Sequence, residues 1–196
     1  MYEAHKLDKT GAGPGDVVID CGASVGEVTA YFCSKGSEVY AFEPNKYAFD
    51  VLKRRFSNNP NVHCVQKGVS APEQAGIAKL YLHEHAESDQ VKYSTGSSTR
   101  ADKCNINLKN YLEIQLLDLC SFIKILNRPI KVLKIDIEGA EMELIDSLIE
   151  QKIAHNIEHI FVETHEKKIP SLREPLEALK KKIEKEGLTN IDLTWR

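Results

Sequence analysis

The sequence predicts a single α/β domain built on a doubly wound, mostly parallel sheet. Short β-branched or continuous apolar runs alternate along the chain with helix-like segments, which is the pattern of β-α-β units. A glycine-containing turn joins the first apolar run to the first helix-like segment, as in open sheets that bind ligands beyond the carboxyl ends of their strands. With 196 residues, 42% of them hydrophobic, the chain has the size of one domain, which we place at 1–196 with a core at about 15–193.

The expected elements follow one another in the order that this fold requires. Apolar runs predict strands at residues 17–19, 39–42, 62–65, 79–82, 130–135, 159–162 and 188–193, of which the short run at 79–82 is expected at a sheet edge. Helix-like patterns predict helices at residues 27–35, 46–56, 116–126, 140–151 and 172–186. Breakers support these boundaries, because Pro14 precedes the first strand, Pro60 follows the second helix and Gly187 follows the last helix.

Residues 83–110 are expected to form a mobile insertion in this domain. The segment is polar and includes a run of serine, threonine and glycine at 94–99. A segment of that length without regular structure is unusual inside a compact domain and commonly has a function. We therefore expect it to close over a cleft when a substrate is bound.

Composition and charge disfavour several classes of function. The 26 lysines and arginines against 29 aspartates and glutamates give a net charge of -3, so no overall positive field recruits nucleic acid or an anionic membrane. No stretch approaches the ~20 apolar residues of a membrane span, and the N-terminus lacks the apolar run of a signal peptide. The five cysteines are scattered without a C-x-x-C motif, which favours reduced thiols in the cytoplasm over a disulfide framework or a zinc site.

The turn after the first strand is the strongest functional signal. Residues 17–26 read Val-Val-Ile-Asp-Cys-Gly-Ala-Ser-Val-Gly, and the glycines there let a backbone approach a ligand closely. Asp20 at the crevice would repel the pyrophosphate of a dinucleotide and suits a cationic ligand such as S-adenosylmethionine. Glu43 lies 23 residues after Asp20, near the offset at which an acidic residue binds ribose hydroxyls. The opposing interpretation is an ordinary turn, in which Asp20 caps the helix and Glu43 is a solvated strand end.

A second group of acidic residues follows the predicted strand at 130–135. Asp136 and Glu138 would lie beyond the carboxyl end of this strand, and their side chains share a face if the chain is still extended there. For Glu141 we prefer a simple role at the positive end of the helix dipole. His165 ends the next predicted strand, where it is either a base that titrates near neutral pH or a surface histidine among charged neighbours.

Four segments, in this order, resemble the FkbM-type methyltransferases, a branch of the class I S-adenosylmethionine-dependent fold. They read Asp-Cys-Gly-Ala-Ser-Val-Gly at 20–26, Phe-Glu-Pro-Asn at 42–45, Lys-Ile-Asp-Ile-Glu-Gly-Ala-Glu at 134–141 and Val-Glu-Thr-His at 162–165. The third segment is the most specific, and the resemblance spans about residues 15–165. It implies a seven-stranded type of sheet, S-adenosylmethionine bound across 20–26 and Glu43, and methylation of a hydroxyl, commonly on a sugar, glycolipid or polyketide.

The sequence departs from the family pattern in three places. Ser24 stands where such loops usually have asparagine. Only fourteen residues precede Gly15, so the N-terminal extension that often helps to cover the cleft is short. The chain also stops where one further strand would normally return antiparallel, so we expect a truncated C-terminal strand pair.

These observations assign cofactor binding and catalysis to particular residues. The predicted cofactor-binding residues are Asp20, Gly22, Ala23, Ser24, Gly26, Thr29, Glu43, Pro44, Val69 and Asp136. Methyl transfer needs alignment and removal of the acceptor's proton, for which the candidates are Asp136, Glu138 and His165, with no metal expected. His83 and His85 alternate close to two acidic residues, but this pattern favours a solvated edge strand over a metal site.

The preferred function is an S-adenosylmethionine-dependent O-methyltransferase acting on a hydroxyl of a sugar, glycolipid or other small molecule. A nicotinamide-dependent oxidoreductase is disfavoured by Asp20 and by the lack of a G-x-G-x-x-G motif. A non-catalytic adenosyl-binding module stays open as a third interpretation, favoured if the short termini leave the cleft uncovered. The expected partner is a small-molecule or glycan acceptor, and the sequence identifies neither that acceptor nor the oligomeric state.

Overall fold

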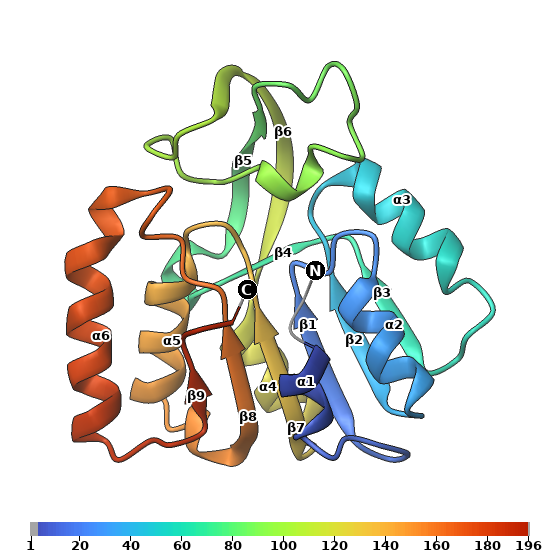
Figure 1. The fold of residues 1–196 in the computed structure, drawn as a ribbon, viewed down its shortest axis with the longest axis vertical. Helices are drawn as coiled ribbons and strands as arrows, with labels where there is room; N and C mark the ends of the chain where they lie inside the picture. The colour runs from blue at the N-terminus through green and yellow to red at the C-terminus, as the bar shows by residue number, and fades with distance from the viewer. Residues whose placement is uncertain (1–3, 196) are drawn as a thin grey trace.

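A six-stranded parallel sheet forms the centre of the protein, whose computed structural model describes residues 4–195 (Figure 1). The strand order is β3-β2-β1-β7-β8-β9, and each neighbouring pair is parallel. The strands are β1 (Val17–Cys21), β2 (Glu38–Phe42), β3 (Val62–Val65), β7 (Ile130–Ile135), β8 (Ile157–Val162) and β9 (Ile191–Asp192). The strand order reverses between β1 and β7, which is where sheets of this kind bind ligands.

Helices cover both faces of the sheet, as the predicted doubly wound fold requires (Figure 1). One face is covered by α1 (Ala4–Asp8), α2 (Glu27–Ser34) and α3 (Lys46–Arg55). The other face is covered by α4 (Leu119–Leu126), α5 (Glu141–Glu150) and α6 (Arg173–Lys185). Short 3-10 turns are η1 (Pro72–Gln74), η2 (Ser94–Gly96), η3 (Ala154–Asn156) and η4 (Pro170–Leu172). The predicted fold class is therefore confirmed.

A second, three-stranded sheet lies beyond the carboxyl ends of the central strands (Figure 1). Its strands are β4 (Gly68–Ser70), β6 (Ile106–Asp118) and β5 (Gly76–His83), with β5 at the edge and antiparallel to β6. The predicted helix at 116–126 is wrong for its first three residues, because β6 continues through Asp118. The Asp118 carboxylate accepts a hydrogen bond from the Ser121 N–H, and this N-cap starts α4 at Leu119.

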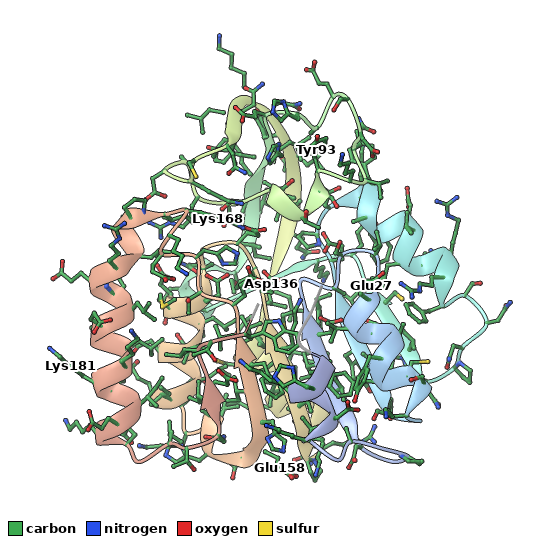
Figure 2. The ribbon with its side chains drawn as sticks, in the orientation of Figure 1. Glu27, Tyr93, Asp136, Glu158, Lys168 and Lys181 are labelled. Atoms are coloured by element: carbon green, nitrogen blue, oxygen red, sulfur yellow. The ribbon has the colours of Figure 1, made fainter. Side chains whose placement is uncertain are left out.

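Residues 84–105 form a loop above the central sheet. Figure 2 shows Tyr93 of this loop above Asp136. The predicted insertion at 83–110 is too long, since His83 ends β5 and residues 106–110 belong to β6. The loop is fixed at several points. Ser98 and Tyr81 exchange two backbone hydrogen bonds of 2.8 and 2.9 Å, and the Cys104 N–H donates to the Lys168 carbonyl. Mobility of this loop stays a prediction.

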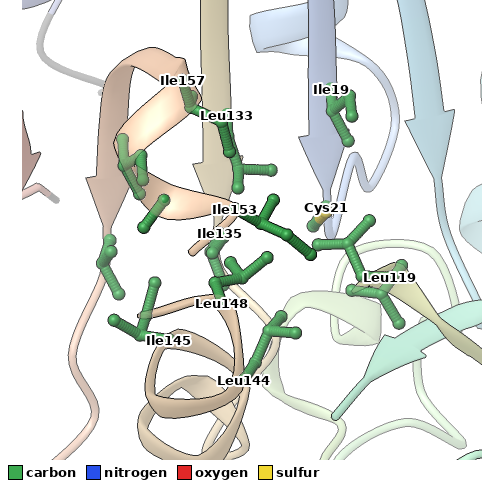
Figure 3. Packing of buried hydrophobic residues seen from close by; sticks show 14 of the residues in the cluster. Ile19, Cys21, Leu119, Leu133, Ile135, Leu144, Ile145, Leu148, Ile153 and Ile157 are labelled. Atoms are coloured by element: carbon green, nitrogen blue, oxygen red, sulfur yellow. The ribbon is translucent and has the colours of Figure 1, made fainter. Parts of the chain in front are cut away.

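The larger hydrophobic core lies between the central sheet and helices α4 to α6 (Figure 3). Ile19 of β1 and Leu133 of β7 pack there in one cluster with Leu144 and Leu148 of α5. Val18 points to the opposite face, because successive residues of a strand alternate between the two sides. This packing holds β1 and β7 side by side, and it thereby fixes the loops that follow them.

The C-terminal end of the sheet differs from the seven-stranded type that the resemblance implies. The sheet has six strands among residues 4–195, and β9 pairs with β8 over only two residue positions. This pairing is parallel, and no antiparallel strand follows it within the described residues.

Two further expectations concern the surroundings of the protein. No helix within residues 4–195 is long and apolar enough to cross a membrane. All five cysteines are free thiols, with Cys21 and Cys120 buried and Cys104 exposed. The cytoplasmic location stays a prediction.

Candidate active site

A cavity of about 350 Å³ lies at the carboxyl ends of β1, β2 and β7, beneath the second sheet. Its walls come from the loops after these strands, from the second sheet and from the loop at 84–105. The lining includes seven residues that the sequence analysis singled out, namely Gly22, Ser24, Glu43, Pro44, Val69, Asp136 and Glu138. Figure 2 shows Asp136 at the centre of the molecule. Predicted cofactor and catalytic residues therefore share one cavity.

Two glycines of the loop after β1 are required by close packing within the protein. Gly22 has a φ of +79°, and a Cβ atom there would lie 1.8 Å from the backbone oxygen of Asp136. Gly26 has a φ of +88°, and a Cβ atom there would lie 2.5 Å from the Phe56 ring. Glycine adopts such left-handed conformations without strain. We expected these glycines to let a ligand approach the backbone closely. At Gly22 and Gly26 it is instead another part of the protein, Asp136 or Phe56, that lies close to the backbone.

Glu43 presents a fixed carboxylate to the cavity. The residue is 7% exposed, so it is not a solvated strand end. Its Oε2 accepts a hydrogen bond from the Ser24 N–H and its Oε1 accepts one from the Asn45 N–H, each at 2.8 Å. Burial raises the pKa of Glu43 to about 7, although both N–H groups oppose this shift. Because a carboxylate offers about four acceptor sites, lone pairs remain for two ligand hydroxyls.

Asp20 lies below the cavity and does not face it. Its Oδ2 accepts a hydrogen bond of 2.7 Å from the Thr29 hydroxyl, and its Oδ1 lies 3.4 Å from Lys134 Nζ. The expectation that Asp20 faces a cationic ligand is therefore wrong, since the residue is fully buried and its cation is a lysine of β7. Lys134 also donates a hydrogen bond of 2.8 Å to the Gly22 carbonyl. Asp20 thus supports the loop after β1 through Lys134.

Lys134 is a functional candidate that the sequence analysis missed. Its side chain is 5% exposed. The Nζ atom lies 3.4 Å from Asp20 Oδ1 and 3.5 Å from Asp136 Oδ2. Burial lowers the pKa of Lys134, but Asp20 and Asp136 outweigh burial and hold that pKa above its ordinary value. Lys134 therefore stays charged between the two loops. The signal that could have revealed it was a lysine between the apolar residues Leu133 and Ile135 at the end of a predicted buried strand.

Asp136, Glu138 and His165 meet at the edge of the cavity. The His165 Nε2 atom lies 3.1 Å from Glu138 Oε2 and 3.7 Å from Asp136 Oδ1. Glu138 has a φ of +60°, so a left-handed turn, and not an extended chain, brings its side chain beside that of Asp136. This conformation is strained for glutamate and persists where surrounding contacts enforce it. The three predicted catalytic residues are therefore adjacent, although by a different backbone path than expected.

His165 is buried, which excludes its interpretation as a surface histidine. Its side chain is 1% exposed and lies between Glu138 and Glu141, whose Oε1 is 3.0 Å from Nδ1. Burial lowers the pKa of His165, but the two carboxylates outweigh burial and raise that pKa to about 10. The expectation that His165 titrates near neutral pH is therefore wrong for the protein without a bound ligand or metal, in which the ring is protonated at neutral pH.

Glu141 is fully buried and has more than a helix-dipole role. Both of its carboxylate oxygens accept hydrogen bonds of 3.0 Å from the Gly139 N–H, and Oε1 accepts another of 3.1 Å from the Ile137 N–H. Glu141 therefore fixes the turn that carries Glu138, and its carboxylate is also in ion-pair contact with the ring of His165.

Lys103, from the loop at 84–105, reaches the same cluster and was not singled out from the sequence. Its side chain is fully buried, and Nζ lies 2.6 Å from Glu138 Oε2 and 2.7 Å from the Gly96 carbonyl. Burial raises the pKa of Glu138, but His165 and Lys103 outweigh burial and lower that pKa to about 2. No sequence pattern marks Lys103, because lysines in polar segments are usually solvated.

The remaining predicted residues lie outside the lining of the cavity. Ala23, Gly26 and Thr29 are part of the packing below it, where Thr29 binds Asp20. His83 ends β5 and stacks on Tyr93 with ring centroids 4.9 Å apart. Within the described part of the chain, His83 and His85 belong to no group of three metal-ligating side chains.

The sheet, with a cavity at the reversal of its strand order, defines a Rossmann-like α/β protein. The chain belongs to the FkbM family of methyltransferases, since the model of the Methyltransferase FkbM domain matches residues 20–185. The solved structure of a methyltransferase FkbM from Methylobacillus flagellatus KT is similar at 19% identity, with a TM-score of 0.41. The match covers 71% of this chain and 30% of that one, so the chain spans less than a third of that protein. No curated protein matches the chain.

Proposed function

We propose that this chain is an S-adenosylmethionine-dependent O-methyltransferase that acts on a hydroxyl of a sugar, glycolipid or other small molecule. The proposal depends above all on the fixed, buried carboxylate of Glu43, which faces a cavity shared with Asp136 and Glu138. Membership of the FkbM family supplies methyl transfer as the reaction class. The partner would be a small-molecule or glycan acceptor, encountered in the cytoplasm.

The cofactor would lie across the carboxyl ends of β1 and β2. Glu43 would accept hydrogen bonds from the ribose hydroxyls, while Pro44 and Val69 would contact the adenine ring. The loop containing Gly22 and Ser24 would face the methionine part. The cavity volume of about 350 Å³ is within the range of small-molecule sites. When bound, S-adenosylmethionine supplies a methyl group carried on a sulfonium.

Asp136 and Glu138 would orient the acceptor on the other side of the cavity. Their side chains are 27% and 15% exposed and line its wall, so both are accessible to a bound hydroxyl. A carboxylate within hydrogen-bond reach can align this hydroxyl with the methyl carbon and accept its proton. His165 would hold Glu138 in place, because its ring is already protonated. The loop at 84–105 would exclude water from above.

Calorimetry with the purified chain tests the cofactor. We expect saturable heat with S-adenosylmethionine and S-adenosylhomocysteine and none with NAD, whose pyrophosphate would meet the carboxylates of Glu43 and Asp136. Tight NAD binding without heat from S-adenosylmethionine would contradict the proposal. Cofactor binding without transfer of a labelled methyl group to any of a panel of sugars and glycolipids would favour a non-catalytic adenosyl-binding module.

The affinity for S-adenosylhomocysteine should depend on the protonation of Glu43. Its carboxyl group accepts hydrogen bonds from the ribose hydroxyls much more strongly when ionised, and the pKa of Glu43 in the free protein is raised to about 7. Affinity should therefore fall about tenfold as the pH is lowered from 8 to 6. Glu43→Gln should weaken binding by about 1 to 3 kcal/mol at pH 8 and remove most of this pH dependence. Calorimetry at several pH values measures both effects, and an equal slope in the variant would exclude Glu43 as their source.

A further inference from the structure

We propose that Asp136, Glu138 and His165 form a binding site for one divalent cation of the Mg²⁺ or Mn²⁺ type. Each side chain offers one ligand atom, and the three atoms lie within 4.8 Å of one another. The His165 ring would release its Nε2 proton to solvent when the cation binds, because only a neutral imidazole nitrogen binds a metal. Carboxylate oxygens suit these hard cations, and Mn²⁺ also accepts an imidazole nitrogen. The sequence predicts no metal here, because nothing in it indicates that His165 is buried against the two carboxylates.

The spacing of the three atoms suits adjacent corners of one octahedral cation. Ligands about 2.1 Å from such a cation lie about 3 Å from each other when they occupy adjacent corners. The His165 Nε2 atom is 3.1 Å from Glu138 Oε2 and 3.7 Å from Asp136 Oδ1. The Asp136 and Glu138 ligand atoms lie within 4.8 Å of each other, so the Asp136 carboxylate would move toward Glu138 when the cation binds. The residues follow β7 and β8, which are neighbours in the sheet, so the scaffold beneath them is rigid.

The surroundings of His165 are those of a metal-binding histidine. Such a histidine usually has a carboxylate at its other ring nitrogen, which orients the ring. Glu141 has this position, with Oε1 3.0 Å from Nδ1, and is itself fixed by backbone N–H groups. Both ring nitrogens are buried, and neither the contact of Nδ1 with Glu141 nor that of Nε2 with Glu138 is aligned as a hydrogen bond. The buried Nε2 atom of His165 therefore faces the carboxylates of Asp136 and Glu138 without an aligned hydrogen bond to either.

Negative charge exceeds positive charge in this part of the described structure. The carboxylates within 4 Å of the His165 ring belong to Asp136, Glu138, Glu141 and Glu163. The lysines that face them are Lys103, which pairs with Glu138, Lys134, which is shared between Asp136 and Asp20, and Lys168, which lowers the pKa of Glu163. Buried carboxylates are stable when cations compensate them. When the His165 ring is neutral, as a metal ligand must be, the four carboxylates outnumber these lysines, and a divalent cation would remove the excess.

Lys103 shares Glu138 with the proposed cation. Its Nζ lies 2.6 Å from Oε2, the same oxygen that is closest to His165. The two oxygens of a carboxylate offer about four acceptor sites, so Glu138 can bind the ammonium group and a cation together. Cation binding is thereby coupled to the position of the loop at 84–105, which carries Lys103.

The proposed cation would lie in the wall of the cavity, beside the space for the acceptor. A hard cation binds hydroxyl oxygens and lowers the pKa of a bound hydroxyl, which eases removal of its proton. This role rests on the proposed methyltransferase function. Binding of the cation does not, so the two can be tested separately.

Titration of Mn²⁺ into the chelator-treated full chain tests the site. Free Mn²⁺ is followed by electron paramagnetic resonance, in the absence of cofactor. We expect one ion per chain with a Kd below about 1 mM, and a loss of affinity of at least about tenfold in Asp136→Asn and in His165→Asn. His85→Asn is the matched control, because His85 is an exposed histidine next to acidic residues, and it should bind Mn²⁺ as the wild type does.

Pulsed resonance of the wild-type complex should show coupling to an imidazole nitrogen, which identifies a histidine ligand even where a variant fails to fold. Absence of saturable binding, absence of nitrogen coupling, or unchanged affinity in both site variants would overturn the proposal. A loss of affinity in His85→Asn would place the ion on the loop and would also overturn it. Binding of S-adenosylmethionine is measured separately by calorimetry. A result that rules out the cation site therefore does not contradict the proposed cofactor.

Discussion

Replacement of Asp136 by asparagine should reduce methyl transfer by about 10²- to 10⁴-fold. The carboxylate is held from two sides, with Oδ1 3.7 Å from His165 Nε2 and Oδ2 3.5 Å from Lys134 Nζ. Asparagine keeps the size of the side chain and removes the charge that would orient an acceptor hydroxyl or bind a cation beside it. The Kd of S-adenosylmethionine should change far less, because the proposed ribose contact is made by Glu43. Transfer of a labelled methyl group and calorimetry measure the two quantities.

Asp146→Asn is the matched control for this experiment. Asp146 on α5 is also an ion-paired aspartate, with Lys182 as its partner, but it lies outside the lining of the cavity. Its variant should keep wild-type turnover. If turnover and cofactor affinity fall together in Asp136→Asn, the residue holds the methionine ammonium group. Unchanged turnover would remove Asp136 from the mechanism and leave Glu138 as the candidate.

The strands β1 and β7 could be predicted because nearly all of their residues are buried, which favours runs of apolar residues. β1 is an example, with all five residues from Val17 to Cys21 buried. β6 was missed in spite of the alternation of Leu112, Ile114 and Leu116 with polar residues, which is typical of a strand. Apolar residues stand on both sides of Asp118 and continue into α4, so one helix from residue 116 fitted the pattern equally well. The N-cap at Asp118 was the local signal that separates the two elements.

The sequence could predict only those features of the candidate site that follow from the order of the strands in the sheet. Glu43 and Asp136 follow strands whose carboxyl ends meet at one edge of the sheet, so their proximity to a common cavity follows from the strand order. The direction of Asp20 does not follow, because it depends on the register that places Lys134 directly opposite on β7. Lys103 is separated from Glu138 by 35 positions and lies in an irregular loop, where no periodicity indicates burial.

Gly22→Ala should destabilise the protein by about 3 kcal/mol and abolish cofactor binding. The added Cβ would lie 1.8 Å from the Asp136 backbone oxygen, and backbone cannot move aside as a flexible side chain can. Relief would require separation of the loops after β1 and β7. The hydrogen bond from Lys134 to the Gly22 carbonyl depends on this close approach. Urea unfolding followed by circular dichroism measures the stability, and calorimetry measures the binding.

Gly15→Ala separates the close approach from the cost of the backbone conformation. Gly15 has a φ of +89°, similar to that of Gly22, but a Cβ atom there would meet nothing within 4 Å. Its alanine variant should therefore lose only about 1 kcal/mol, the cost of a left-handed conformation for a residue with a Cβ. Equal destabilisation of the two variants would mean that the loop after β1 does not contact Asp136 in solution. Lys134 would then not be fixed between Asp20 and Asp136, and the charge arrangement on which the candidate site depends would be wrong.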